Sequence, residues 1–250
     1  MAVLFLLPLL WTAYSSVTGR NDGGFGNYER LADYGSGIGT YLLNTAVVAI
    51  VAVTVTVVTT TLGGYAMARL AFPGRNLLFL VTLAILMVPY TMILVPLYIL
   101  LGWLGLQNSL VGLGLVLAVL QLPFGLFMMR NSFEALPVEL EEAALIDGCT
   151  VTGALRRVLL RGVLPGIVTV ALFSFLAAWN EFVAPLIFLT DGSKFTLPVA
   201  LFNLQSGNLG SVDFGALQAG VVTSALPCVA VFLVLQRYYV RGFTSGALKG

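Results

Sequence analysis

The amino-acid sequence contains several apolar stretches that are each about long enough to cross a lipid bilayer. The hydrocarbon core of a bilayer requires about 20 consecutive apolar residues in a helix. Six stretches meet or approach that length, at residues 1–18, 41–67, 77–101, 109–129, 163–189 and 214–236. Prolines inside the last four indicate packed helices, because neighbouring helices must satisfy the carbonyls that a proline frees. The sequence therefore predicts an all-α, polytopic membrane bundle of about six transmembrane helices, in a single domain over residues 1–250.

The composition excludes several classes of function. Hydrophobic residues make up 59% of the chain and charged residues only 9%, whereas about a quarter of the residues of a soluble domain are charged. A net charge of +1 without a basic patch excludes a nucleic-acid partner. Histidine is absent, which removes Ser-His-Asp catalysis and histidine ligands. Cys149 and Cys228 form no CxxC pair, so we expect no metal site. Without histidine or clustered carboxylates at membrane depth, we also expect no enzyme activity.

The first apolar stretch, residues 1–18, is short and has no charged residue ahead of it. It could instead be a signal peptide, but it lacks a positive amino-terminal region and a clear small-residue cleavage site. Both interpretations leave five further spans.

The distribution of Lys and Arg predicts the orientation of the spans. Cytoplasmic loops carry an excess of these residues. Nine of the twelve fall in alternate connections, namely Arg69, Arg75, Arg130, Arg156, Arg157, Arg161, Arg237, Arg241 and Lys249. We therefore expect an inner-membrane protein with cytoplasmic amino and carboxyl termini.

The connection at residues 131–162 has the pattern of two short helices outside the bilayer. Pro137 suits the first position of a helix, and three glutamates follow where negative charge favours the helix dipole. Gly148 stands where a left-handed helix end is expected, and a second amphipathic helix begins near Thr150. The first helix has a small apolar face. Such a face could dock another protein or rest on lipid headgroups, and the glutamates favour docking.

Within this loop, Glu142-Ala143-Ala144 followed by Asp147-Gly148 resembles the EAA motif of ABC-importer permeases. The resemblance implies a coupling helix that sits in a cleft of a cytoplasmic ATPase subunit, with those five residues as the contacts. The family pattern also has a proline thirteen residues after the glycine, where this chain has Arg161, although Pro165 is present.

Three further segments resemble carbohydrate-importer permeases of the maltose G-subunit type. They are YLLNT at 41–45, WNEF at 179–182, and the carboxyl-terminal QRYYVRGFTSGALKG at 236–250. In that family the tail reaches the interface between the ATPase subunits. This implies contacts from the cytoplasmic tail at 237–250, through Arg241, Gly246, Lys249 and Gly250. A disordered end is the alternative.

Asn180 and Glu181 fall inside the fifth predicted span, beside Trp179. A charged group at membrane depth is costly, so it should face the bundle interior, a partner or water. These three residues are therefore candidates for a sugar path. Glu181 could instead lie near the outer boundary or join the helix to a partner permease.

No GxxxxGK[ST] loop occurs, so the chain cannot cradle ATP phosphates itself. The resemblance implies no cofactor in this chain, with ATP bound by two separate ATPase subunits. It further implies a second permease subunit, expected to be a different chain, and an extracytoplasmic sugar-binding protein. The expected function is a permease subunit that forms half of the path for a sugar or oligosaccharide. The alternatives are a secondary active transporter, or an ABC permease for a non-sugar solute.

Overall fold

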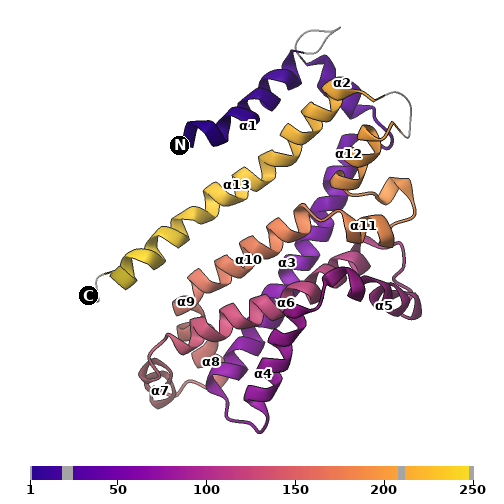
Figure 1. The fold of residues 1–250 in the computed structure, drawn as a ribbon. Helices are drawn as coiled ribbons and strands as arrows, with labels where there is room; N and C mark the ends of the chain where they lie inside the picture. Colours follow the sequence, from indigo (N-terminus) through magenta and orange to yellow (C-terminus); the bar gives the residue numbers. More distant parts are fainter. Residues whose placement is uncertain (1, 19–24, 208–211, 248–250) are drawn as a thin grey trace. The chain divides into compact units, whose positions relative to one another are not determined.

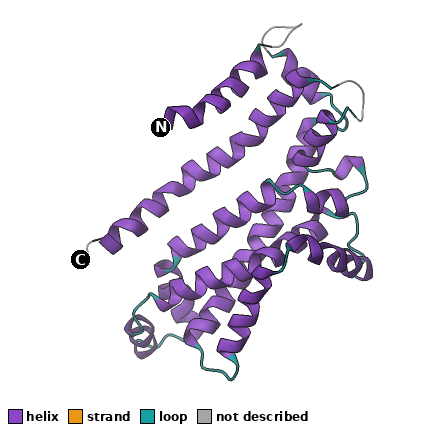
Figure 2. Ribbon diagram, viewed as in Figure 1, coloured by secondary structure: helices purple, strands orange, loops and turns teal. Residues whose placement is uncertain are grey.

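The computed structural model describes residues 2–18, 25–207 and 212–247, and this part of the chain consists of helices joined by turns and loops, with no strand (Figures 1 and 2). The predicted all-α class is confirmed. The helical form follows from the composition, because in lipid each backbone N–H and C=O must be satisfied within its own segment or within a closed barrel.

Three helices are long and apolar enough to cross a membrane. They are α3 (Ile38–Arg69), α6 (Leu110–Glu134) and the first 23 residues of α13 (Phe214–Ala247). Their mean hydropathies are 2.3, 2.2 and 2.0. These helices correspond to the predicted spans at 41–67, 109–129 and 214–236.

The predicted span at 77–101 is divided into two helices. The first part comprises α4 (Arg75–Ala84) and a short 3-10 turn, η1 (Ile85–Met87), and the second part is α5 (Tyr90–Trp103). The two parts are bent by 106°. Val88, which precedes Pro89, is extended, with φ −82° and ψ 127°. The ring of a proline disfavours the helical region for the preceding residue, which explains the break.

The predicted span at 163–189 is also interrupted. A bend of 75° separates residues 151–162 from α10 (Leu164–Trp179), and residues 180–182 separate α10 from α11 (Val183–Phe188). The described residues thus contain three candidate spans, or up to five if each bent pair is one span, against about six expected. The helix α1 (Ala2–Val17) has only 16 residues, below the length that spans a bilayer unbent.

The chain divides into two compact units. Unit 1 comprises residues 1–49, 97–114 and 178–232, and unit 2 comprises residues 50–96, 115–177 and 233–250. In unit 1, α2 (Gly26–Ala32), α12 (Leu197–Gln205) and the start of α13 pack around Leu31, Leu204 and Ala216. A Cβ atom on Gly220 would collide with the side chain of Leu201, so a small residue permits this close approach.

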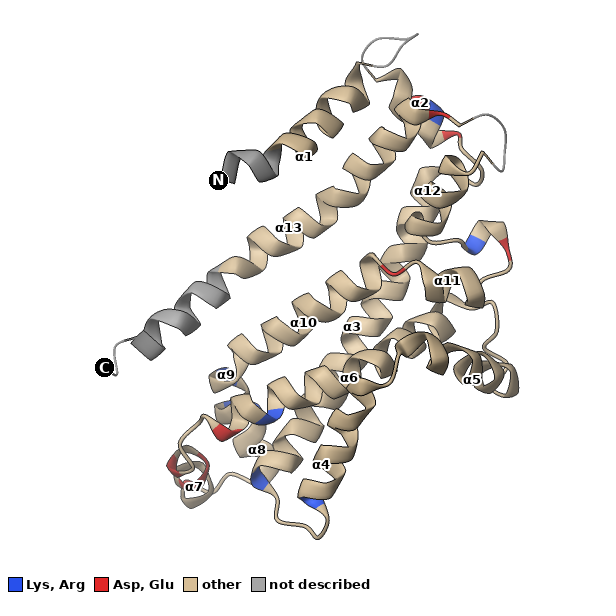
Figure 3. Ribbon diagram, in the orientation of Figure 1, with Lys and Arg blue, Asp and Glu red and all other residues tan. Residues whose placement is uncertain are grey.

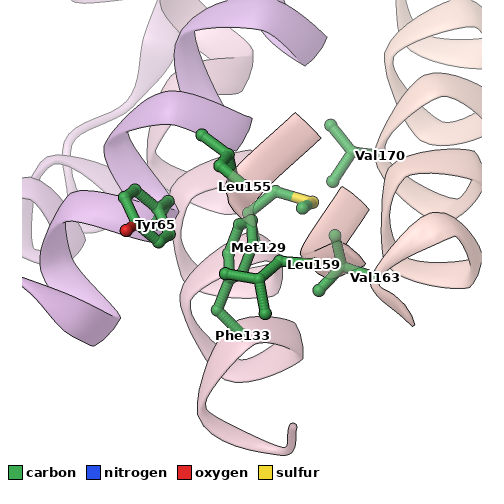
Figure 4. Close-up of a cluster of buried hydrophobic side chains, with 7 residues drawn as sticks. All are labelled: Tyr65, Met129, Phe133, Leu155, Leu159, Val163 and Val170. Atoms are coloured by element: carbon green, nitrogen blue, oxygen red, sulfur yellow. The ribbon is translucent and has the colours of Figure 1, made fainter. Parts of the chain in front are cut away.

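In unit 2, the core joins α3, α6, α10 and the segment at 151–162. Seven buried side chains form it, namely Tyr65, Met129, Phe133, Leu155, Leu159, Val163 and Val170 (Figure 4). The helices α3 and α6 approach closely where Gly64 faces Met129, since a Cβ atom on Gly64 would lie 2.6 Å from Met129 Cβ. This core packs the loop between α6 and α10 against the carboxyl-terminal part of α3, which is predicted to be cytoplasmic.

Candidate functional site

The loop between α6 and α10 begins with the short helix α7 (Glu139–Ile146). Its first turn carries Glu139, Glu141 and Glu142, as the dipole argument predicts. The helix starts two residues later than expected, and Pro137 contributes only its carbonyl, which accepts from Leu140 N at 3.4 Å. Figure 3 shows the acidic residues gathered on α7, with Arg at the nearby ends of α3, α4 and α6.

The end of α7 is a left-handed glycine turn, as predicted. Gly148 has φ +84°. Its N–H donates to Leu145 O at 3.0 Å, and the N–H of Cys149 donates to Ala144 O at 3.0 Å. These two hydrogen bonds define a Schellman motif, which satisfies the last carbonyls of the helix. A Cβ atom on Gly148 would meet nothing within 4 Å, so the requirement for glycine comes from the backbone alone.

The second helix begins at Thr150, which agrees with the prediction. Thr150 Oγ1 accepts from Gly153 N at 3.2 Å and caps α8 (Val151–Ala154). A π-helical turn η2 (Leu155–Leu159) and α9 (Leu160–Gly162) complete the segment. The chain then bends at Val163. With Arg161 in place of the family proline, the helix continues one residue beyond that position.

The predicted contact residues divide by exposure. Glu142, Ala143, Asp147 and Gly148 are exposed, whereas Ala144 is buried. Two exposed apolar residues were not among the predicted contacts: Ile146, whose exposed fraction is 86%, and Leu145 beside it. Both side chains stand next to the glycine turn. Exposed apolar side chains grouped in a polar segment are characteristic of a protein–protein contact surface.

Glu141, which was not among the predicted site residues, anchors α7. Tyr65 Oη donates to Glu141 Oε1 at 2.6 Å, and Arg69 Nε lies 3.7 Å from Glu141 Oε2. The side chains of Arg69 and Glu141 are only 8% and 13% exposed. The spacing of Tyr65 and Arg69, four residues apart near the end of α3, is the available sequence signal, because residues at that spacing share a helix face.

Arg69 extends this anchor to α6. Its Nη2 donates to the carbonyls of Phe133 at 2.9 Å and Leu136 at 2.7 Å. The last carbonyls of a helix have no partner within that helix, and a cation there also complements the dipole. Glu141, Tyr65 and Arg69 therefore join α7 to the ends of both α3 and α6 within unit 2.

The candidates for the sugar path lie in unit 1, around the break between α10 and α11. Trp179 is 4% exposed, and its Nε1 donates to Ser224 O at 3.1 Å. Glu181 Oε1 accepts from the N–H groups of Val183 at 2.9 Å and Ala184 at 3.1 Å. Glu181 thereby caps α11, and Asn180 is the exposed member of the three.

The tail residues are only partly described. The helix α13 continues to Ala247, so the backbone is helical at Arg241 and Gly246. Lys249 and Gly250 lie outside the described residues. In the described ranges, no group of three or more His, Cys, Asp or Glu side chains could hold a metal ion.

Comparisons with known proteins identify the family. A family model described as "Binding-protein-dependent transport system inner membrane component" matches residues 60–245. The chain is 33% identical over 261 residues to the trehalose/maltose transport system permease protein MalG of Thermococcus litoralis, covering 100% of this chain and 94% of that protein. It is 32% identical over 258 residues to the diacetylchitobiose uptake system permease protein NgcG of Streptomyces coelicolor, covering 99% and 85%.

A solved structure agrees with these relatives. A chain in the crystal structure of a bacterial ABC transporter involved in the import of the acidic polysaccharide alginate matches with a TM-score of 0.81. Its sequence identity is 23%, and the match covers 95% of this chain and 92% of that chain, which shows a shared fold. The chain therefore belongs to the family of binding-protein-dependent transport system inner membrane components, as a multi-pass permease subunit of an ABC importer whose ATP hydrolysis is performed by a partner ATPase.

Proposed function

We propose that this chain forms half of the translocation path for a sugar or oligosaccharide, with a second permease subunit of different sequence completing the path. Two ATPase subunits would dock on the cytoplasmic side, and a sugar-binding protein would deliver the cargo on the other. The named cargoes of the trehalose/maltose and diacetylchitobiose relatives support a carbohydrate. A non-sugar solute is the alternative within the same family.

The observation that carries the proposal is the exposed glycine turn at the end of α7. Glu142, Ala143, Ile146 and Gly148 are exposed together there. Meanwhile, the buried side of the helix is held by Glu141 through Tyr65 and Arg69. A helix that is anchored on one side and exposes small and apolar side chains on the other can bind a partner and transmit its movement.

The contacts of Glu141 with Tyr65 and Arg69 suggest how that movement reaches the rest of unit 2. When the ATPase subunits close, α7 would move with the ends of α3 and α6, because the anchor and the core around Phe133 and Leu159 join these segments. Packed cores shift as bodies rather than deform continuously. The cytoplasmic part of unit 2 would then move as one body and reverse the side on which the path opens.

The orientation of the chain follows from the positive-inside rule. Nine of the twelve basic residues fall in connections expected on the same side as the 131–162 loop, so we propose that this loop and both termini are cytoplasmic. We also propose that the tail around Arg241 and Gly246, continuing through Lys249 and Gly250, contacts the ATPase subunits. In the path itself, Asn180 would meet the cargo, while Trp179 and Glu181 hold the chain break in position.

ATP hydrolysis by the reconstituted importer tests the proposal. The complex contains this chain, its partner permease, the ATPase subunits and the binding protein, with maltose, trehalose or diacetylchitobiose as cargo. We expect stimulation by cargo-loaded binding protein, and its loss in Gly148→Asp and in the charge reversal Glu142→Lys. Glu134→Gln, on the exposed surface of α6, is the control and should behave as the wild type. Full stimulation in both loop variants would refute the coupling role of the turn.

A further inference from the structure

Unit 1 contains a pocket of about 630 Å³, between the turn that precedes α3 and the segment that connects α11 to α12. This volume lies in the range of small-molecule sites, about 300–1,000 Å³. Three aromatic side chains line it, Tyr34, Tyr41 and Phe195, together with the polar side chains of Ser36, Asp191 and Asn203. The lining therefore combines apolar ring surfaces with a few hydrogen-bonding groups.

One group that lines the pocket, a tyrosine hydroxyl, lacks within the described part of the chain the hydrogen-bond partner that a buried polar group normally has. The hydroxyl of Tyr34 is buried and has no hydrogen-bond partner among the described residues. Burial raises the pKa of this phenol, and the nearby Tyr41 raises it further, so the hydroxyl remains a neutral donor at physiological pH. A buried polar group without a partner is unfavourable, and a ligand with a hydroxyl group would satisfy it.

A second lining group has an oxygen to spare. Asp191 Oδ1 accepts from Ser193 Oγ at 2.7 Å and from Ser193 N at 2.9 Å. The side-chain and then the backbone hydrogen bond lower the pKa of Asp191, so the group is ionised at neutral pH. Both bonds use Oδ1. In the described part of the chain, Oδ2 therefore remains able to accept from a ligand.

The pocket is held in shape by side chains from neighbouring elements. Asn44 Nδ2 donates to the carbonyls of Ser193 at 2.9 Å and Phe195 at 3.0 Å. On the other side, Asn108 Oδ1 accepts from Thr190 N at 3.1 Å and Asp191 N at 3.3 Å. A site that is ordered before binding loses less conformational freedom when its ligand arrives.

We propose that this pocket is a binding site for a short, uncharged saccharide. Sugars present C–H faces that pack on aromatic rings such as Tyr34 and Phe195. Their hydroxyl groups both donate and accept, so one can donate to Asp191 Oδ2 while another accepts from the Tyr34 hydroxyl. An anionic ligand is disfavoured by the carboxylate of Asp191. The inference deepens the proposed function and rests on its carbohydrate cargo.

Saturation-transfer difference NMR on the complete importer in nanodiscs tests the site. The binding protein is omitted, and maltose, trehalose and diacetylchitobiose are the probes. We expect saturable transfer from at least one sugar, and an affinity lowered about tenfold or more in Tyr34→Phe, which removes a donor, and in Asp191→Asn, which replaces a charged acceptor with a more weakly bonding neutral amide. Asp33→Asn, an exposed acidic residue of the same loop that does not line the pocket, should match the wild type.

The variants are chosen to preserve the fold. Asp191→Asn keeps an oxygen for the Ser193 bonds, and Tyr34→Phe removes a hydroxyl without a partner, so the thermal unfolding midpoint should stay at or above that of the wild type. No transfer from any of the three sugars, or equal transfer in the two pocket variants, overturns the proposal. Weaker capture of the binding protein in these variants without a sugar signal also overturns it, since the pocket would then dock protein.

The same preparation separates the two inferences. If cargo-loaded binding protein stimulates ATP hydrolysis while no sugar binds in its absence, the pocket assignment fails and the proposed function stands. If sugar binds and is lost in the pocket variants, but binding protein with cargo gives no stimulation, the site stands and the proposed coupling fails.

Discussion

The hydrogen bond between Tyr65 and Glu141 should contribute measurably to the stability of unit 2. The Oη to Oε1 distance is 2.6 Å, and the carboxylate side chain is only 13% exposed. A hydrogen bond to a charged group contributes about 1.5–3 kcal/mol. The ion pair with Arg69 is longer, at 3.7 Å, and Arg69 Nε makes no hydrogen bond among the described residues. Most of the pairwise energy should therefore come from Tyr65.

A double-mutant cycle measures this energy directly. We would prepare Tyr65→Phe, Glu141→Gln and the double variant, and follow unfolding in mixed micelles by titration with SDS. The interaction energy from the cycle should be about 1–2 kcal/mol, because contacting residues deviate from additivity by about 0.5–3 kcal/mol. Tyr65→Phe should also lower the amount of cargo transported per ATP, since the anchor of α7 is loosened.

The control is the pair Arg130–Glu134, an exposed interaction of a glutamate with an arginine at 2.8 Å on α6. Glu134 is 44% exposed, so its pair should contribute only about 0.3–0.5 kcal/mol. A cycle energy for Tyr65 and Glu141 no larger than that of this control would show that the anchor is not a significant interaction. The helix α7 would then not be expected to move as one body with the ends of α3 and α6.

Three further outcomes are expected. Gly148→Ala should destabilise the loop by about 1–2 kcal/mol, because it places a Cβ atom at φ +84°; circular dichroism melting of the complex measures the loss. Gly64→Ala should destabilise unit 2 by about 1–3 kcal/mol, because its Cβ atom would lie 2.6 Å from Met129 Cβ, as a thermal shift would show. Acidification should weaken the packing of α2 on α13. Burial opposes the ionisation of Asp213, but the hydrogen bonds from Ala216 N and Arg30 outweigh this effect. The pKa of Asp213 is therefore lowered below its usual 3.8. The stabilisation that ionised Asp213 gives to the folded state is fully present above pH 3.8. It is lost as the pH falls through the lowered pKa, and hydrogen exchange at α2 should detect this loss.

Each of these outcomes has a control. Gly148→Asn should lose less than Gly148→Ala, because asparagine tolerates the left-handed region better, and equal losses would contradict the backbone argument. Gly39→Ala in α3 meets nothing within 4 Å, so it should be neutral or stabilising by about 0.5–1 kcal/mol. A loss there as large as that of Gly64→Ala would contradict the steric explanation. Asp213→Asn should abolish the acid-dependent loosening of α2, and its persistence would assign the effect to another group.

The sequence could predict the conformation of the α7 turn in detail, because the requirements are local. Gly148 is needed for a positive φ that few other residues adopt, and Thr150 caps the next helix through its own side chain. The start of α7 was placed within two residues. By contrast, the spans predicted at 77–101 and 163–189 are each divided into separate helices in the described residues. The break at Val88 has a local cause in Pro89, but apolar composition alone does not reveal whether a proline is accommodated in a helix or breaks it. The interruption at Asn180 depends on how the chain packs.

Long apolar helices and the motif of the α7 loop were determined by the sequence alone, since each depends on residues near one another in the chain or on transfer to lipid. Only the tertiary structure decided which glutamate is the anchor. Glu141 and Glu142 are adjacent and chemically identical, yet Glu141 turns toward Tyr65 and Arg69, 76 and 72 positions away in the chain, while Glu142 remains exposed. The pocket around Tyr34 and Asp191 has the same origin, because it exists only where segments about 150 residues apart are packed together, and no local pattern records that proximity.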